Sequence, residues 1–182
     1  MNVEEFQIYN DVFVSYNMLT KRTLHAFHDP VNRIDYIFRV AYRSNVDSAH
    51  QDQTYIEIFE VTLGTKPYLL DVIDHTVLGG STLSIADFTV YDGLMYVLSY
   101  GKGLYELRLA PNQRVEIRTF FEIRMDVNRF AINRLGFNDD LKVVFSNGNN
   151  LYQYDWIIGK APTLTAKYSI MPNSEVENLF ID

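Results

Sequence analysis

The chain of 182 residues contains no cysteine, which excludes disulfide bonds, thiolate metal ligands and a cysteine nucleophile. It also lacks an apolar run long enough for a membrane-spanning helix, and its first residues, MNVEEFQIYN, lack the basic and apolar segments of a signal peptide. We find no Asn-x-Ser/Thr glycosylation acceptor. These absences favour an intracellular location, although a cysteine-free domain cut from a secreted chain would share them.

Basic residues are scarce as well: 16 Lys and Arg stand against 23 Asp and Glu, and the formal net charge is −7. Because nucleic acid and anionic membranes attract basic patches, neither is expected as a partner. Glycine and proline are also few, whereas 13 Tyr and 12 Phe contribute to a hydrophobic content of 47%. No segment shows sustained 3.6-residue periodicity, so the composition indicates an all-β chain with a substantial core.

An internal repeat organises the chain. Residues of one segment recur 47 positions later without a gap, and a repeat in the forties built from short strands is typical of β-propeller blades. The matching residues are Leu94, Val97, Leu98, Ser99, Gly101, Leu104 and Tyr105 in the first copy, and Leu141, Val144, Phe145, Ser146, Gly148, Leu151 and Tyr152 in the second.

The repeated unit is predicted to be a meander of four strands. Asp92-Gly93 tolerates the positive φ angles of a tight hairpin turn, and Gly101-Lys102-Gly103 supplies the same freedom in a second turn. Alternation of apolar and polar residues indicates the flanking strands. The four expected strands cover residues 88–90, 94–100, 104–109 and 115–118.

Extended to the whole chain, this pattern predicts one domain, residues 1–182, with a β-propeller-like array of about four four-stranded antiparallel blades. Residues 23–27 are expected as the third strand of the first blade, which Asp29-Pro30 ends. Larger rings are common, so the array is either a partial propeller or one that another chain completes; an open sandwich or barrel is the alternative. The expected blades are roughly 1–30, 31–78, 82–124 and 128–172, and 176–182 begins a closing or further strand.

The unit resembles the WD40, NHL and related β-propeller repeats through Asp92-Gly93 in its first turn and Gly101 in its second. Asp155-Trp156 is similar to the WD dipeptide that closes a third strand, and Trp156 is expected to pack between blades. The preceding copy has Arg108-Leu109 there, and the Gly-His pair of WD40 repeats is missing. The resemblance implies a fold and no single activity, because propellers serve as scaffolds, hydrolases, lyases and lectins.

Residues that could carry chemistry are few. His25 and His28 are three positions apart in an expected strand, so they point to opposite faces and are not expected to share a metal ion. Asp71 and Asp74-His75 are expected to cap turns. Since the chain has no nucleophile elbow, phosphate-binding loop, dinucleotide fingerprint or calcium loop, we predict no catalytic residue, no metal and no cofactor.

The predicted binding site consists of the loops between the second and third strands of each unit, which emerge on one side of the array. One of them, residues 43–53, is polar and longer than its equivalents. The alternative is that this loop is a tolerated surface insertion. The candidate partner contacts are Arg43, Asp47, His50, Asp52, Tyr100, Lys102, Asn147 and Asn149.

The sequence therefore favours a protein–protein interaction or scaffold module that binds a protein partner through these loops. Two alternatives stay open. One is an enzyme or carbohydrate-binding propeller with a site in its central channel. The other is a structural subunit of a larger assembly, formed by self-association or by blades that another chain supplies.

Overall fold

The structure is a computed structural model that describes residues 24–30, 32–43, 53–62, 64–74, 77–78, 85–110, 114–125, 127–134, 140–147 and 149–169. Within these ranges there is no helix of the length and apolar character needed to cross a membrane. The part of the expected first blade before residue 24, and the closing or further strand expected at 176–182, lie outside the described residues. The strands are β1 (Leu24–Asp29), β2 (Ile34–Arg43), β3 (Gln53–Val61), β4 (Tyr68–Ile73), β5 (Ile85–Tyr91), β6 (Leu94–Ser99), β7 (Gly103–Leu109), β8 (Val115–Glu122), β9 (Arg129–Arg134), β10 (Asp140–Ser146), β11 (Asn150–Ile157) and β12 (Thr163–Ser169).

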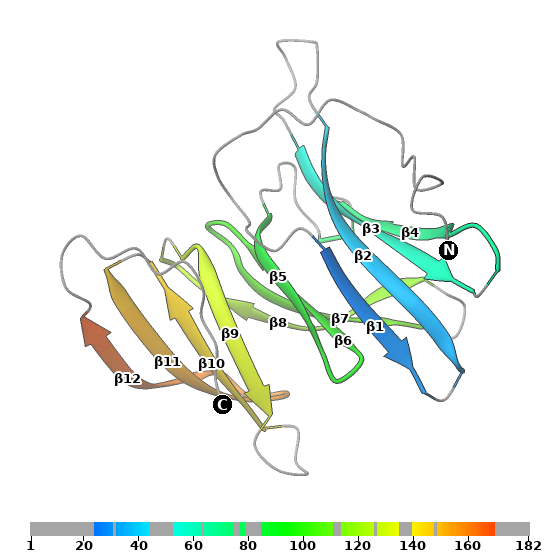
Figure 1. Ribbon diagram of the computed structural model, residues 1–182. Coiled ribbons are helices and arrows are strands. Elements are labelled where there is room, and N and C mark those ends of the chain that lie inside the picture. The colour runs from blue at the N-terminus through cyan, green and yellow to red at the C-terminus, as the bar shows by residue number, and fades with distance from the viewer. Residues whose placement is uncertain are drawn as a thin grey trace.

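These strands form three four-stranded antiparallel meanders, none of them closed: the N-terminal sheet β1–β4, the central sheet β5–β8 and the C-terminal sheet β9–β12 (Figure 1). The expected all-β class and the four-stranded antiparallel unit are thereby confirmed. The turn between the first two strands of the central sheet also has the predicted geometry, with φ of 50° at Asp92 and 73° at Gly93. These angles are those of the tight hairpin turns that match strand twist.

The division near residue 30 differs from the expected one. Strand β1 pairs with β2 from Leu24↔Arg39 to Asp29↔Ile34, so the expected boundary between 30 and 31 falls inside one sheet. Asp29 starts a hairpin turn here, because its carboxylate accepts hydrogen bonds from the backbone N and side-chain Nδ2 of Asn32 at 3.1 and 2.7 Å. Residues 24–27 of the expected third strand thus belong to the first strand of a sheet, and the described residues contain three sheets where about four were expected.

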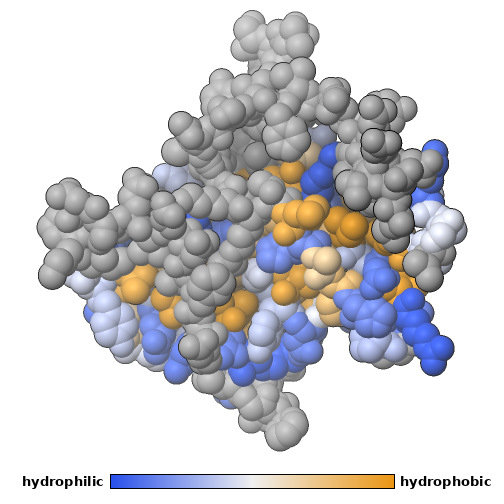
Figure 2. All heavy atoms as spheres, in the orientation of Figure 1, coloured by the Kyte–Doolittle hydropathy of each residue, from blue (hydrophilic) through white to orange (hydrophobic). Residues whose placement is uncertain are grey.

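Strands β5–β7 of the central sheet are mostly buried on both faces, whereas β8 is mostly exposed. Figure 2 shows hydrophobic residues gathered in the middle of the view and hydrophilic residues along its lower border. Towards the N-terminal sheet the central sheet presents Phe88, Met95 and Val97. Towards the C-terminal sheet it presents Tyr96 and Leu98. The partners across these two interfaces are Tyr36, Phe38, Ile56 and Ile58 on one side, and Phe130, Leu141, Val143, Phe145 and Trp156 on the other.

The gapless repeat matches second strand with second strand, but equivalent residues lie on opposite faces. Leu98 packs against the C-terminal sheet, which follows it, whereas its equivalent Phe145 packs against the central sheet, which precedes it. The cause lies in the following turn, since Ser99 pairs with Gly103 but Ser146 pairs with Leu151, one residue further on. A register change of one residue moves every side chain of a strand to the other face.

Candidate functional site

The first strands of the three sheets run in the same direction. Along β5 and β9, the Asp87 carboxylate accepts a hydrogen bond from the Phe130 backbone N at 3.2 Å, and the Tyr91 hydroxyl accepts one from the Arg134 backbone N at 3.3 Å. Along β1 and β5, the His25 ring lies edge-on to the Phe88 ring at 4.6 Å. The last residues of β2, β6 and β10 therefore lie at the same end of the molecule, which we call the turn end (Figure 1).

The β6–β7 turn is held rigidly at the turn end. Lys102 donates its backbone N–H to the Ser99 carbonyl at 3.1 Å, and its own carbonyl accepts from the Ile123 N–H at 2.9 Å. Gly103 is required by a close approach, since a Cβ there would lie 2.0 Å from the Phe121 carbonyl oxygen. On this fixed turn the side chain of Tyr100 is 45% exposed, and Lys102 is half-buried.

The β10–β11 turn uses one of the predicted contact residues to build itself. The Asn147 side-chain oxygen accepts the Asn150 backbone N–H at 3.0 Å, and its Nδ2 donates to the Tyr152 hydroxyl at 3.4 Å. Asn147 therefore shapes the turn, while Asn149 is exposed.

The third connection is described only at its ends. Arg43 closes β2 and pairs with Gln53 of β3, which places both at the turn end. Asp47, His50 and Asp52 lie outside the described residues. The topology thus brings Tyr100, Lys102, Asn147 and Asn149 to the end where β2 also finishes.

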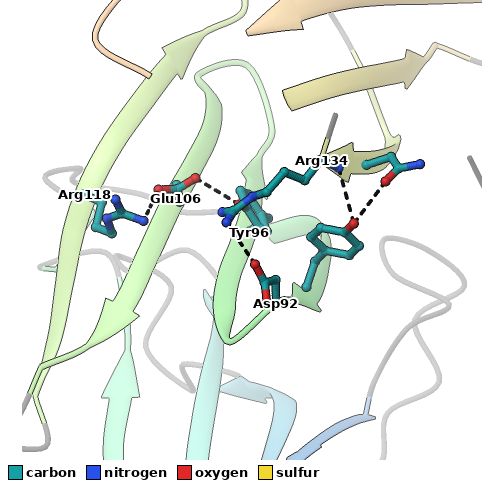
Figure 3. Close-up of polar contacts among 7 residues, drawn as sticks. Asp92, Tyr96, Glu106, Arg118 and Arg134 are labelled. Atoms are coloured by element: carbon teal, nitrogen blue, oxygen red, sulfur yellow. Dashed lines mark hydrogen bonds and ion pairs between the residues drawn. The ribbon is translucent and has the colours of Figure 1, made fainter. Parts of the chain in front are cut away.

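A buried polar network between the central and C-terminal sheets was not expected from the sequence. Glu106 of β7 is fully buried; its Oε2 accepts the Tyr96 hydroxyl at 2.9 Å, and Arg118 Nη1 lies 3.1 Å from its Oε1 (Figure 3). Burial, and then the charge of Glu106, raise the pKa of Tyr96, so this phenol stays protonated at neutral pH. Arg134 reaches across from β9 to the Asp92 carboxylate at 2.9 Å. Because Glu106 has no exposed surface, we assign the network to packing of the two sheets.

The histidines point to opposite faces of β1, as predicted. His25 faces the central sheet, whereas exposed His28 bonds through Nδ1 to Asp35 Oδ1 at 2.7 Å. Asp71 does more than cap a turn: its Oδ2 accepts the Val115 backbone N–H at 2.8 Å and so joins the N-terminal and central sheets. Among the described residues, no group of three or more His, Asp or Glu side chains is arranged to hold a metal ion.

No protein-family model matches the chain, and a comparison with curated proteins finds no match. The function is therefore argued from the geometry of the molecule.

Proposed function

We propose that the three sheets are consecutive blades of a β-propeller-like array, and that the protein is an interaction module whose turn end binds a protein partner. The chain order supports the array: each sheet is traced from first to fourth strand, and the chain then returns to the first strand of the next sheet. The first strands β1, β5 and β9 lie side by side, as the strands nearest the axis of such an array do.

The observation that carries the binding proposal is the display of Tyr100 on a fixed turn. A half-exposed tyrosine offers a large contact area and a hydroxyl, and aromatic residues are enriched at protein interfaces. The turn that presents it is held by the two backbone hydrogen bonds of Lys102. Ordering this turn on binding therefore costs little conformational entropy.

The first experiment places a photo-crosslinking amino acid at position 100 in one variant and at position 157 in a control. Ile157 has a similar exposure, 38%, but ends β11 at the opposite end of the molecule. We expect position 100 to crosslink one protein that position 157 does not. We also expect Tyr100→Ala to weaken binding of that protein at least about tenfold, as for an interface hot spot, and Ile157→Ala to leave it unchanged. Equal crosslinking from both positions would contradict the proposal.

The second experiment replaces residues 44–52 with Gly-Lys-Gly, the sequence of the shorter turn at 101–103. If the β2–β3 connection takes part in binding, this variant loses affinity for the crosslinked protein while its unfolding curve is unchanged. Full retention of the partner would show that the loop is a surface insertion and would confine the site to the other two turns.

A further inference from the structure

The second and third strands of each sheet share a cross-strand pair that the sequence repeat does not reveal. In all three sheets an acidic residue of the third strand stands opposite a tyrosine or a lysine of the second strand. These pairs are Tyr36↔Glu60, Tyr96↔Glu106 and Lys142↔Asp155.

In the first two sheets this pair faces the next sheet. Tyr36 belongs to the apolar cluster between the N-terminal and central sheets. Tyr96 belongs to the cluster between the central and C-terminal sheets, where Arg134 of β9 interacts with its hydroxyl. The position therefore marks the face on which the following sheet packs.

The third pair lies on the face of the C-terminal sheet that points away from the central sheet. Leu141 and Trp156 are buried against the central sheet, so their strand neighbours Lys142 and Asp155 are on the other side. The Asp155 Oδ1 atom is buried and has no hydrogen-bond partner among the described residues. Because this oxygen is already buried within the chain, a second molecule cannot reach it, and half-buried Lys142 is the charged group that this face offers to a partner.

The outward face of the N-terminal sheet has complementary features. A hollow of about 430 Å³ lies at β1 and β2. It is lined by the hydrogen-bonded His28 and Asp35 together with Ala26, Phe27, Tyr36, Ile37 and Val61. Both polar side chains are more than half exposed, at 60% and 63%. His28 is the last residue of β1 that points outward, as Arg134 is the last residue of β9 that points back to the central sheet.

We propose that the outward face of the C-terminal sheet packs on the outward face of the N-terminal sheet of a second copy of this chain. In this contact the Lys142 ammonium meets the Asp35 carboxylate, which is more than half exposed beside His28. The two faces differ, so the contact is head-to-tail and continues into a closed ring or a chain of copies. It uses sheet faces and leaves the turn end free, so it is independent of the proposed partner site.

The test is a charge exchange followed by analytical ultracentrifugation. We expect the wild-type chain to form species above its monomer mass of 21.2 kDa. Lys142→Glu and Asp35→Lys each place like charges together and should weaken self-association by roughly tenfold or more. The double variant restores opposite charges at the contact and should regain self-association. Lys160→Glu, in the exposed turn after β11, is the matched control and should associate as wild type does.

Circular dichroism shows which variants are folded. Asp35 is exposed, so if Lys142→Glu fails to fold, Asp35→Lys decides the question by itself. A wild-type chain that stays monomeric at every concentration overturns the proposal. Self-association that persists in Asp35→Lys overturns the proposal as well. So does an equal loss of self-association in the Lys160→Glu control.

Discussion

Among the described glycines, Gly103 is the one at which a side chain would find least room. It pairs with Ser99 on one side and Glu122 on the other, and its φ is 151°. An added Cβ would lie 2.0 Å from the Phe121 carbonyl oxygen, far inside the roughly 3.5 Å of an ordinary contact. That oxygen belongs to the backbone of β8, so it can move away only if the pairing of β7 with β8 is disturbed.

Gly103→Ala should therefore be strongly destabilising. Backbone strain and steric overlap each cost about 1–3 kcal/mol, so together they should lower the free energy of unfolding by several kcal/mol. Gly101→Ala is the matched control: Gly101 also has a positive φ, 68°, but a Cβ there meets nothing within 4 Å. It should cost only the strain of about 1–2 kcal/mol for a left-handed alanine.

Urea unfolding followed by tryptophan fluorescence measures both variants. Trp156 is the single tryptophan of the chain and is 1% exposed in the folded state, so its emission reports loss of the core. If Gly103→Ala were no less stable than Gly101→Ala, the described approach of β7 to β8 would be wrong.

Three further predictions concern buried side chains. Glu106→Ala should lower the free energy of unfolding by about 3–5 kcal/mol, because it leaves Arg118 and Tyr96, the partners of a buried acid, unpaired. Glu106→Gln keeps an acceptor and should cost less. Equal losses of the two variants in urea unfolding would count against the network. The raised pKa of Tyr96 leaves the free energy of unfolding unaffected below about pH 10, where the phenol is protonated in both the folded and the unfolded chain. Above that pH it lowers the free energy of unfolding, because the unfolded chain loses the proton first. Urea titrations at neutral and alkaline pH should thus show a smaller alkaline loss for Tyr96→Phe than for wild type, and an identical loss would refute the assignment. Trp156→Ala should cost about 3–5 kcal/mol, whereas Ile157→Ala, at the surface, should cost less than about 1 kcal/mol; circular dichroism during thermal unfolding compares them.

Local backbone chemistry was predictable from the sequence. Asp92-Gly93 was expected to adopt positive φ angles and does so, because few other residues tolerate that conformation. Trp156 was expected between sheets and is buried against the central sheet, 5.6 Å from the Phe121 ring.

Features that depend on neighbouring sheets were not predictable. Alternation along β7 places Glu106 among the polar residues that should face water, yet it is fully buried, because both faces of the central sheet are covered. The repeat matched Leu98 with Phe145 although they face opposite directions, since identity of sequence carries no information on a register that the turn length sets.

The shared end of the second connections was predictable, whereas the hydrogen bonds of their residues were not. Antiparallel meanders with parallel first strands bring the second connections of all sheets to one end, whatever the side chains. Individual hydrogen bonds decide which residues of those turns are available for binding a partner. Asn147 is engaged within its own turn, and only the structure shows this.

The burial of β5–β7 on both faces has a consequence for how the chain melts. Strands β5–β7 depend on both flanking layers for their cover, so detachment of either layer exposes an apolar surface that water penalises. Partly unfolded forms are therefore costly, and the three layers should lose structure in one cooperative step. For the same reason, truncation at either end should endanger the middle of the molecule as much as the part removed.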